Sequence, residues 1–102
     1  MDKEKVLIIV QQYTEKVLNI LSPDQIVLFG SYATNTAHEN SDIDIAVFFN
    51  GFNDDYLKVS GLLWRLTFEI NFHIEPILVD INDDPSGFVN HILLTGITVY
   101  KK

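Results

Sequence analysis

The stretch from Leu28 to Phe49, which reads LFGSYATNTAHENSDIDIAVFF, constrains the fold more than any other part of the chain. It holds two apolar runs of strand length, separated by small and polar residues between Gly30 and Asp42. Neither run is long enough, or spaced at a period of 3.6 residues, to form an amphipathic helix. The chain is therefore predicted to contain two short strands, the second of which starts with two carboxylates, Asp42 and Asp44.

Helical patterns lie on both sides of these strands. Residues 3–21 carry apolar side chains at alternating steps of four and three, which predicts a helix that ends at the first proline of the chain. A second helix is predicted from Asn53, as its N-cap, to about Ile70, with two aspartates in its first turn. Trp64 and Phe68 widen its apolar face, toward the core or toward a partner surface.

The rest of the chain alternates strand and helix. Residues 74–79 form a third predicted strand, and Pro76 indicates that it lies at or near a sheet edge, because proline lacks a ladder donor. A short helix is predicted to end at Gly96, and residues 97–100 form the last strand. The chain length of 102 residues predicts a single domain that spans residues 1–102.

Composition narrows the function classes. Seven Lys and Arg against fourteen Asp and Glu give a net charge of -7, which opposes non-specific binding to nucleic acids and to anionic membranes. The absence of cysteine excludes disulfides and thiolate metal sites. No apolar run reaches the roughly 20 residues that a bilayer span needs, and the amino terminus does not resemble a signal peptide, so we expect a cytoplasmic protein.

Asp42 and Asp44 pose a problem of charge. Alternate residues of a strand point to the same face, so the two carboxylates project together and repel each other unless a cation lies between them. The sequence from Gly30 to Gly51 contains no Lys or Arg. Oxygen ligands without cysteine favour Mg2+, Ca2+ or Mn2+. The simpler alternative is a solvated Asp42 with Asp44 paired to a distant Lys58 or Arg65.

Gly30 and Ser31 lie directly after the first strand. Glycine lets the backbone approach a ligand closely, and Ser31 with the amide groups that follow can donate hydrogen bonds to phosphate oxygens. By itself the pair also suits an ordinary turn at the end of a strand. Combined with a carboxylate pair on the next strand, it indicates a site for a metal and a nucleotide.

The joint pattern of a strand, Gly30-Ser31, and Ser41-Asp42-x-Asp44 before a second strand resembles the signature of the nucleotidyltransferase superfamily that includes DNA polymerase beta. The chain length is similar to that of the minimal nucleotidyltransferase (MNT) family, which is often encoded beside a HEPN-domain partner as a toxin–antitoxin pair. With the element order, this resemblance implies an α/β (α+β) fold, a nucleotidyltransferase core with a small mixed β-sheet and helices packed mainly on one face.

The resemblance also implies roles for individual residues. Gly30 and Ser31 would hold the triphosphate of ATP or another nucleoside triphosphate, and Asp42 and Asp44 would bind two Mg2+ ions, with Mn2+ as an alternative. A third carboxylate on a neighbouring strand would complete the metal site and accept a proton from the attacking group. We favour Glu75 for this role. The competitor is Asp80, which has the opposite facing by simple alternation along the strand.

The implied function is transfer of a nucleoside monophosphate, AMP from ATP, to a hydroxyl acceptor. The acceptor would be a HEPN-type partner, which makes this chain an antitoxin, or a small molecule, and a homodimer or the partner would complete the site. Two positions depart from the family, which commonly has Arg where this chain has Tyr32 and Gly where it has Asn35. The lost cation motivates an alternative, a weak or inactive subunit that binds and neutralises a partner. A purely structural metal site is a third possibility.

Overall fold

The computed structural model describes all residues, 1–102, and contains the predicted order of elements. These elements are α1 (Lys3–Ile20), β1 (Gln25–Phe29), β2 (Ile43–Phe49), α2 (Tyr56–Ile70), β3 (Ile74–Asp80), α3 (Phe88–Thr95) and β4 (Ile97–Lys101). None of the three helices combines the length and the apolar character that a bilayer span needs.

The four strands form one mixed sheet in the order β3-β2-β1-β4. β1 pairs antiparallel with β2 and with β4, whereas β2 and β3 are parallel and α2 makes the crossover between them. β3 is an edge strand, as Pro76 predicted. The register between β2 and β3 continues without a bulge from Ile43↔Ile74 to Phe49↔Asp80.

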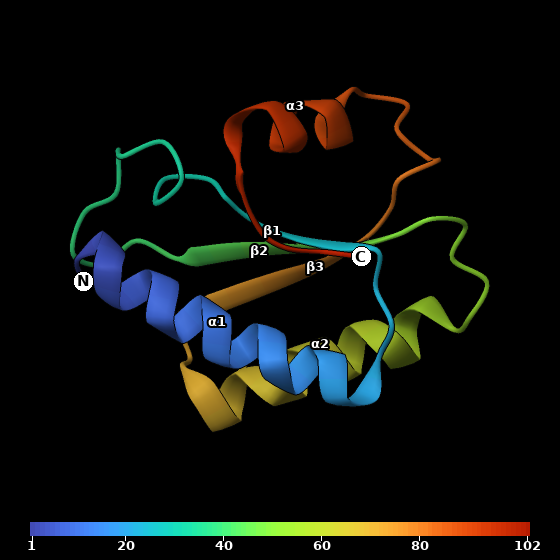
Figure 1. Cartoon of the computed structure of the whole chain (residues 1–102), viewed down its shortest axis with the longest axis horizontal. Coiled ribbons are helices and arrows are strands. Elements are labelled where there is room, and N and C mark those ends of the chain that lie inside the picture. The colour runs from blue at the N-terminus through green and yellow to red at the C-terminus, as the bar shows by residue number, and fades with distance from the viewer.

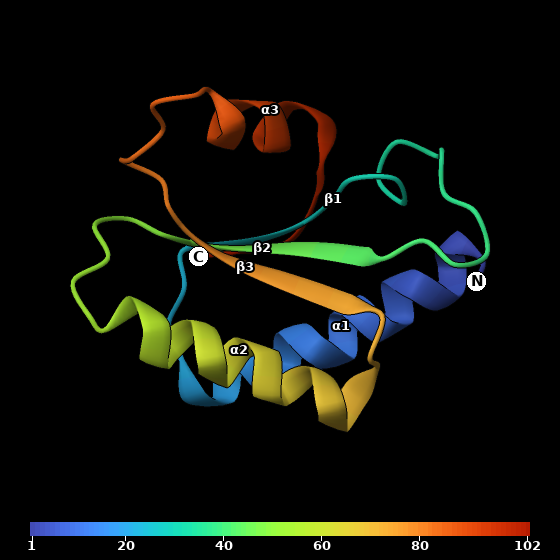
Figure 2. The same cartoon turned by 180° about the vertical axis from the view of Figure 1, so that it is seen from behind.

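Helices α1 and α2 cover one face of the sheet, and α3 alone covers part of the other (Figure 1, and from behind Figure 2). The larger core lies on the side of α1 and α2 and receives alternate residues of β2, among them Ile43, Ile45 and Val47. The smaller core joins α3 to Ala46 and Phe48 of the same strand. The structure thus confirms the mixed sheet with helices mainly on one face.

Capping explains where the helices begin and end. The Asp2 side chain accepts a hydrogen bond from the Lys5 amide (2.8 Å) at the start of α1. The prediction that Asn53 caps α2 is wrong, because the cap is Asp55, whose carboxylate accepts from the Lys58 amide (3.2 Å). Two aspartates that were expected inside the first turn therefore lie before it.

Gly96 ends α3, as predicted, but its backbone is not left-handed (φ -85°). A Cβ atom at this position would collide with the Val27 side chain and with the carbonyl oxygens of Leu28 and Ile92. The glycine is therefore required because α3 turns into β4 directly against β1.

Candidate active site

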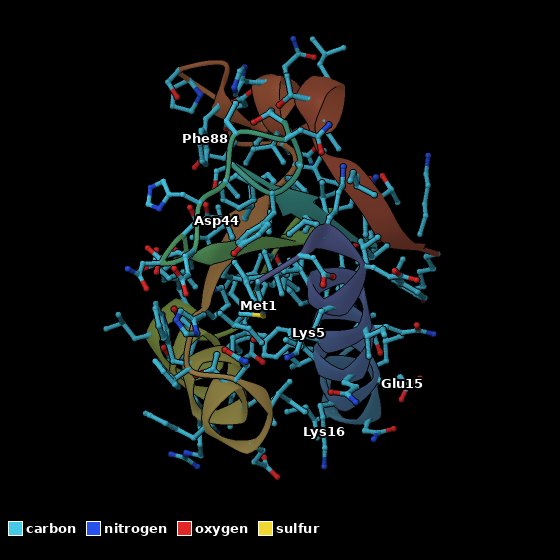
Figure 3. The ribbon with its side chains drawn as sticks, turned by 90° about the vertical axis from the view of Figure 1, so that its left-hand side faces the viewer. Met1, Lys5, Glu15, Lys16, Asp44 and Phe88 are labelled. Atoms are coloured by element: carbon cyan, nitrogen blue, oxygen red, sulfur yellow. The ribbon has the colours of Figure 1, made fainter.

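Three carboxylates meet where β2 and β3 begin. The parallel register places Asp44 directly opposite Glu75. Asp44 shares the face of β2 that carries Ala46 and Phe48, so the pair lies on the α3 side of the sheet, beyond the part that α3 covers. Figure 3 shows Asp44 at this end of the sheet, on the same side as Phe88 of α3. Asp42 lies within hydrogen-bonding reach of Glu75.

The electrostatics of this cluster show an unbalanced negative charge. Burial raises the pKa of Asp44 to about 6, and the neighbouring charges of Glu75 and Asp42 act in the same direction. The pKa of Glu75 is also raised, by desolvation and then by the charge of Asp42 and a hydrogen bond with it. Both effects mean that the folded protein resists ionising these groups together, as expected for a site that lacks a cation.

No basic side chain neutralises the three carboxylates. The single ion pair of the structure joins Lys16 to Glu69 (Nζ–Oε1 3.7 Å) and lies between α1 and α2. Asp44 is thus not paired with Lys58 or Arg65, and the simpler explanation of the Asp42–Asp44 couplet does not hold. The three carboxylates do not already converge as a ready-made metal site. Their oxygen donors do suit Mg2+, which takes one or two carboxylates and completes its shell with water and phosphate.

Gly30 brings the backbone of the preceding loop against Asp44. Its φ of 76° is left-handed, and a Cβ atom there would collide with the Asp44 carboxylate. Phe29, at the end of β1, is the register partner of Asp44. The close approach of a main chain to a carboxylate therefore explains why this position is glycine.

The residues after Gly30 form a helical turn. The amides of Ala33 and Thr34 both donate to the Gly30 carbonyl (3.1 Å each). The amides of Ser31 and Tyr32 donate to no carbonyl of the chain, so they are free to bind an anion. Asn35 has a left-handed φ of 61°, the conformation that favours Gly or Asn.

Tyr32 is buried, with its ring in the core that faces α1 and α2 and its hydroxyl without a partner. A side chain at this position therefore points away from the free amides of the loop. The family commonly has Arg at this position, and no Lys or Arg close to Tyr32 in the sequence takes its place.

A cation comes instead from the start of α1. Lys3 Nζ donates to Asn35 Oδ1 (2.9 Å), which places an ammonium group beside the Gly30–Thr36 turn. Sequence reasoning missed Lys3, because the two residues lie far apart in the chain and no periodicity or motif links them. Only the packing of α1 beneath the loop brings them together.

Asp80, the competitor of Glu75, has a different environment. Its carboxylate accepts hydrogen bonds from the amides of Gly51 (3.2 Å), Phe52 (3.2 Å) and Asn82 (2.9 Å). These bonds lower the pKa of Asp80 and tie the loop after β2 to the end of β3. Asp80 lies opposite Phe49, at the other end of the strand from Glu75, and does not join the carboxylate cluster.

The cluster lies on an open surface. None of the four cavities of the structure is lined by Asp42, Asp44 or Glu75. The cavity of about 600 Å³ beside β3 lies at the Asp80 end, between the start of α2 and the loop before α3. A ligand bound at the carboxylates would therefore remain partly exposed to water.

Comparisons with known proteins show the family of this chain. The family model described as polymerase beta, nucleotidyltransferase, matches residues 9–102. A protein from Methanocaldococcus jannaschii, provisionally named a protein adenylyltransferase, is 28% identical over 99% of this chain and 73% of its own length.

Solved structures share the fold of this chain. A protein from Sulfolobus solfataricus, provisionally named a nucleotidyltransferase, has a TM-score of 0.74 at 20% identity and covers 98% of this chain and 84% of its own. A toxin–antitoxin structure with AMP-PNP has a TM-score of 0.63 at 27% identity, covering 90% of this chain and 73% of that one. Because the family model covers nearly the whole chain, this protein belongs to the polymerase beta nucleotidyltransferase family.

Proposed function

We propose that this domain, residues 1–102, transfers AMP from ATP to a hydroxyl group of another protein. The observation that carries the proposal is that Asp44 lies opposite Glu75, with Asp42 near both and without a basic partner, beside the Gly30 backbone. Such a site lacks positive charge and has free amide donors. The divalent cations that accompany a nucleoside triphosphate would supply the positive charge, and its phosphate oxygens would accept hydrogen bonds from the free amides.

Asp42, Asp44 and Glu75 would hold Mg2+, or Mn2+ in its place. The raised pKa of Asp44 supports this assignment, since a bound cation would restore the ionised form that burial and the neighbouring carboxylates disfavour. When bound, the metal would supply charge stabilisation at the entering and leaving oxygens of the transferred phosphate.

The triphosphate would lie along the turn after β1. The free amides of Ser31 and Tyr32 would donate to its oxygens, and Gly30 would let the backbone approach them. Lys3, held beside this turn by Asn35, would provide the cationic contact that the family usually takes from the loop itself.

The transfer is an in-line displacement at the α-phosphorus. The acceptor oxygen forms a bond to phosphorus, the bond to the β-phosphate oxygen breaks, and pyrophosphate leaves. Glu75 would accept the proton of the acceptor hydroxyl. A carboxylate that bound cations keep ionised can act as this general base.

The relatives support a protein acceptor. One is named a protein adenylyltransferase, and others are solved as toxin–antitoxin assemblies. We infer that the acceptor is a HEPN-type partner and that modification by this chain, acting as the antitoxin, neutralises it.

A transfer assay tests the proposal. Purified protein is incubated with Mg2+, ATP labelled at the α-phosphate and the HEPN-type partner, and protein-bound label is measured. Label should appear with the wild type and disappear with Asp44→Asn or with a chelator, while Asp83→Asn, an exposed loop control, should retain it. If Asp44→Asn transfers as well as the wild type, the proposed site is wrong.

One observation favours a second candidate, a subunit that binds and neutralises its partner without turnover. Tyr32 turns its side chain into the core, so the loop itself offers no cation to a triphosphate. In that case partner binding would persist in Asp44→Asn and no label would be transferred by either protein.

A further inference from the structure

Four large apolar side chains lie exposed along α2 and directly after it. They are Leu57 (81% exposed), Trp64 (44%), Phe68 (83%) and Phe72 (78%). The first three recur at steps of seven and four, so they share one stripe of the helix, and Phe72 follows its C-terminus. Contiguous apolar surfaces of this kind commonly mark sites of protein interaction. We refer to Trp64, Phe68 and Phe72 as the aromatic surface.

Two contacts show which way the aromatic surface faces. On one flank of α2, the Tyr56 hydroxyl donates to the Leu78 carbonyl of β3 (3.2 Å). On the other flank, Glu69 pairs with Lys16 of α1. The aromatic surface lies between these flanks on the outer side of α2, and the helix leads directly into the edge strand β3 (Figure 2).

The aromatic surface reaches the candidate site through Phe72. Phe72 and His73 form the turn between α2 and β3, and Phe72 precedes Glu75 by three residues, so their backbones lie at most about 10 Å apart. Its ring stacks on His73 (centroids 4.4 Å apart), and the His73 amide donates to Asn71 Oδ1 (2.8 Å). The His73 carbonyl in turn accepts from the amide of Ile43, the residue between the two aspartates. These contacts fix the turn that carries Phe72 at the start of β3, close in the chain to Glu75.

The direction of the reaction places the acceptor on this same edge. The free amides of Ser31 and Tyr32 follow β1, Asp44 lies on β2 and Glu75 lies on β3, in the order of the sheet. In an in-line displacement the entering oxygen lies opposite the leaving pyrophosphate. If pyrophosphate lies at Gly30-Ser31, the acceptor must enter from the β3 edge.

The open surface of the site points to a macromolecular acceptor. No cavity encloses the carboxylates, so water has free access to a bound nucleotide until something covers it. The net charge of -7 of the whole chain favours a partner of positive net charge over an acidic protein or a nucleic acid.

We propose that the aromatic surface is the docking site of the acceptor protein, which has a positive net charge, presents an apolar patch and inserts a hydroxyl-bearing side chain beside Glu75. The inference rests on the proposed function, because it assigns a binding place to the acceptor of that reaction. The aromatic surface and Glu75 belong to opposite faces of the sheet but both border its β3 edge, so a docked partner would reach round this edge to aim its hydroxyl at the site.

Photo-cross-linking in the source cell tests the docking place. Benzoylphenylalanine is introduced at position 68 or, as a matched control, at position 94, where Leu94 of α3 is 76% exposed on the other side of the sheet. Position 68 should cross-link to a protein that also carries the label from ATP labelled at its α-phosphate, and position 94 should not. Cross-links from position 68 only to a second copy of this chain, only to unlabelled proteins, or to nothing would overturn the proposal.

Kinetics separate this inference from the proposed function. Phe68→Ser should raise KM for the acceptor protein by about tenfold or more, as expected for an aromatic anchor, and leave KM for ATP unchanged. Leu94→Ser should change neither. If label is transferred but Phe68→Ser has the wild-type KM, the docking site is wrong although the activity is real. If the wild type labels no protein at all, the proposed function itself fails.

Discussion

At the scale of single residues, Gly30 makes the most specific prediction. A methyl group at this position meets the Asp44 carboxylate, whereas at Gly51, which has the same left-handed φ (77° against 76°), it meets nothing within 4 Å. Both Gly→Ala changes should destabilise the fold by about 1–2 kcal/mol because of the backbone conformation. Only Gly30→Ala should also abolish transfer. Chemical denaturation and the transfer assay measure the two effects, and equal activities of Gly30→Ala and Gly51→Ala would contradict the role of Gly30.

Asp44 predicts how stability depends on pH. Its pKa rises from 3.8 to about 6 on folding, so between these values the folded chain binds more protons than the unfolded chain. The free energy of unfolding should therefore fall as pH rises through this window. Asp44→Asn should flatten this part of the profile and raise the melting temperature at neutral pH, and Mg2+ should stabilise the wild type but not the variant. If the free energy of unfolding of Asp44→Asn depended on pH as it does in the wild type and in the control Asp83→Asn, the pKa of Asp44 would not be raised in the folded protein.

Lys3 predicts an effect on nucleotide binding alone. Its ammonium group is held beside the phosphate turn by Asn35, so Lys3→Met should raise KM for ATP about tenfold with little change in kcat, as expected when a charge-assisted contact is lost. Lys16→Met, which removes only the exposed pair with Glu69, is the control. Equal KM values for the two variants would exclude a phosphate contact by Lys3.

At the scale of elements, the parallel pairing of β2 and β3 separates the two acidic residues of β3. Glu75→Gln should leave the fold intact and reduce transfer by about 10²-fold or more, the usual contribution of a general base. Asp80→Asn should lower the melting temperature and leave the transfer rate unchanged. It weakens the hydrogen bonds that fix the loop after β2 but leaves the carboxylate cluster intact. Melting temperatures and transfer rates of both variants test the assignment.

Asp80 also predicts how the stability of the protein responds to acid. The pKa of Asp80 is lowered by the amides that it binds, so its stabilising contribution is present above its unfolded pKa and is lost as pH falls. Asp80→Asn should therefore be less sensitive to acid than the wild type. Loss of activity in Asp80→Asn at a pH where it is fully folded would mean that the carboxylate roles have been exchanged.

At the scale of the whole molecule, the net charge of -7 and the acidic cluster predict that nucleic acids bind only weakly. Single-stranded DNA or RNA should bind no more tightly than about 0.1 mM at physiological salt, the weak end of non-specific binding. Fluorescence anisotropy with a labelled oligonucleotide measures this affinity. Micromolar binding would indicate a nucleic-acid acceptor and would argue against a protein acceptor.

The sequence by itself determined the elements and the facing of the aspartates. Helix and strand differ in the period of their apolar residues, and alternation alone puts Asp42 and Asp44 on one face, so these properties are local. The left-handed backbone at Asn35 could likewise be read from residue type. The N-cap of α2 was the local error, because Asn53 and Asp55 are both good caps and the choice depends on how the loop after β2 is held.

Only the tertiary structure decided what completes the site. The sequence favours Glu75 over Asp80 by its facing, but only the register between β2 and β3 places Glu75 opposite Asp44. The packing of α1 beneath the loop brings Lys3 to Asn35. The core takes up the side chain of Tyr32. Strand pairing and helix packing join residues that lie tens of positions apart, and their free energy comes from burying both partners at once. No pattern within either segment contains that information.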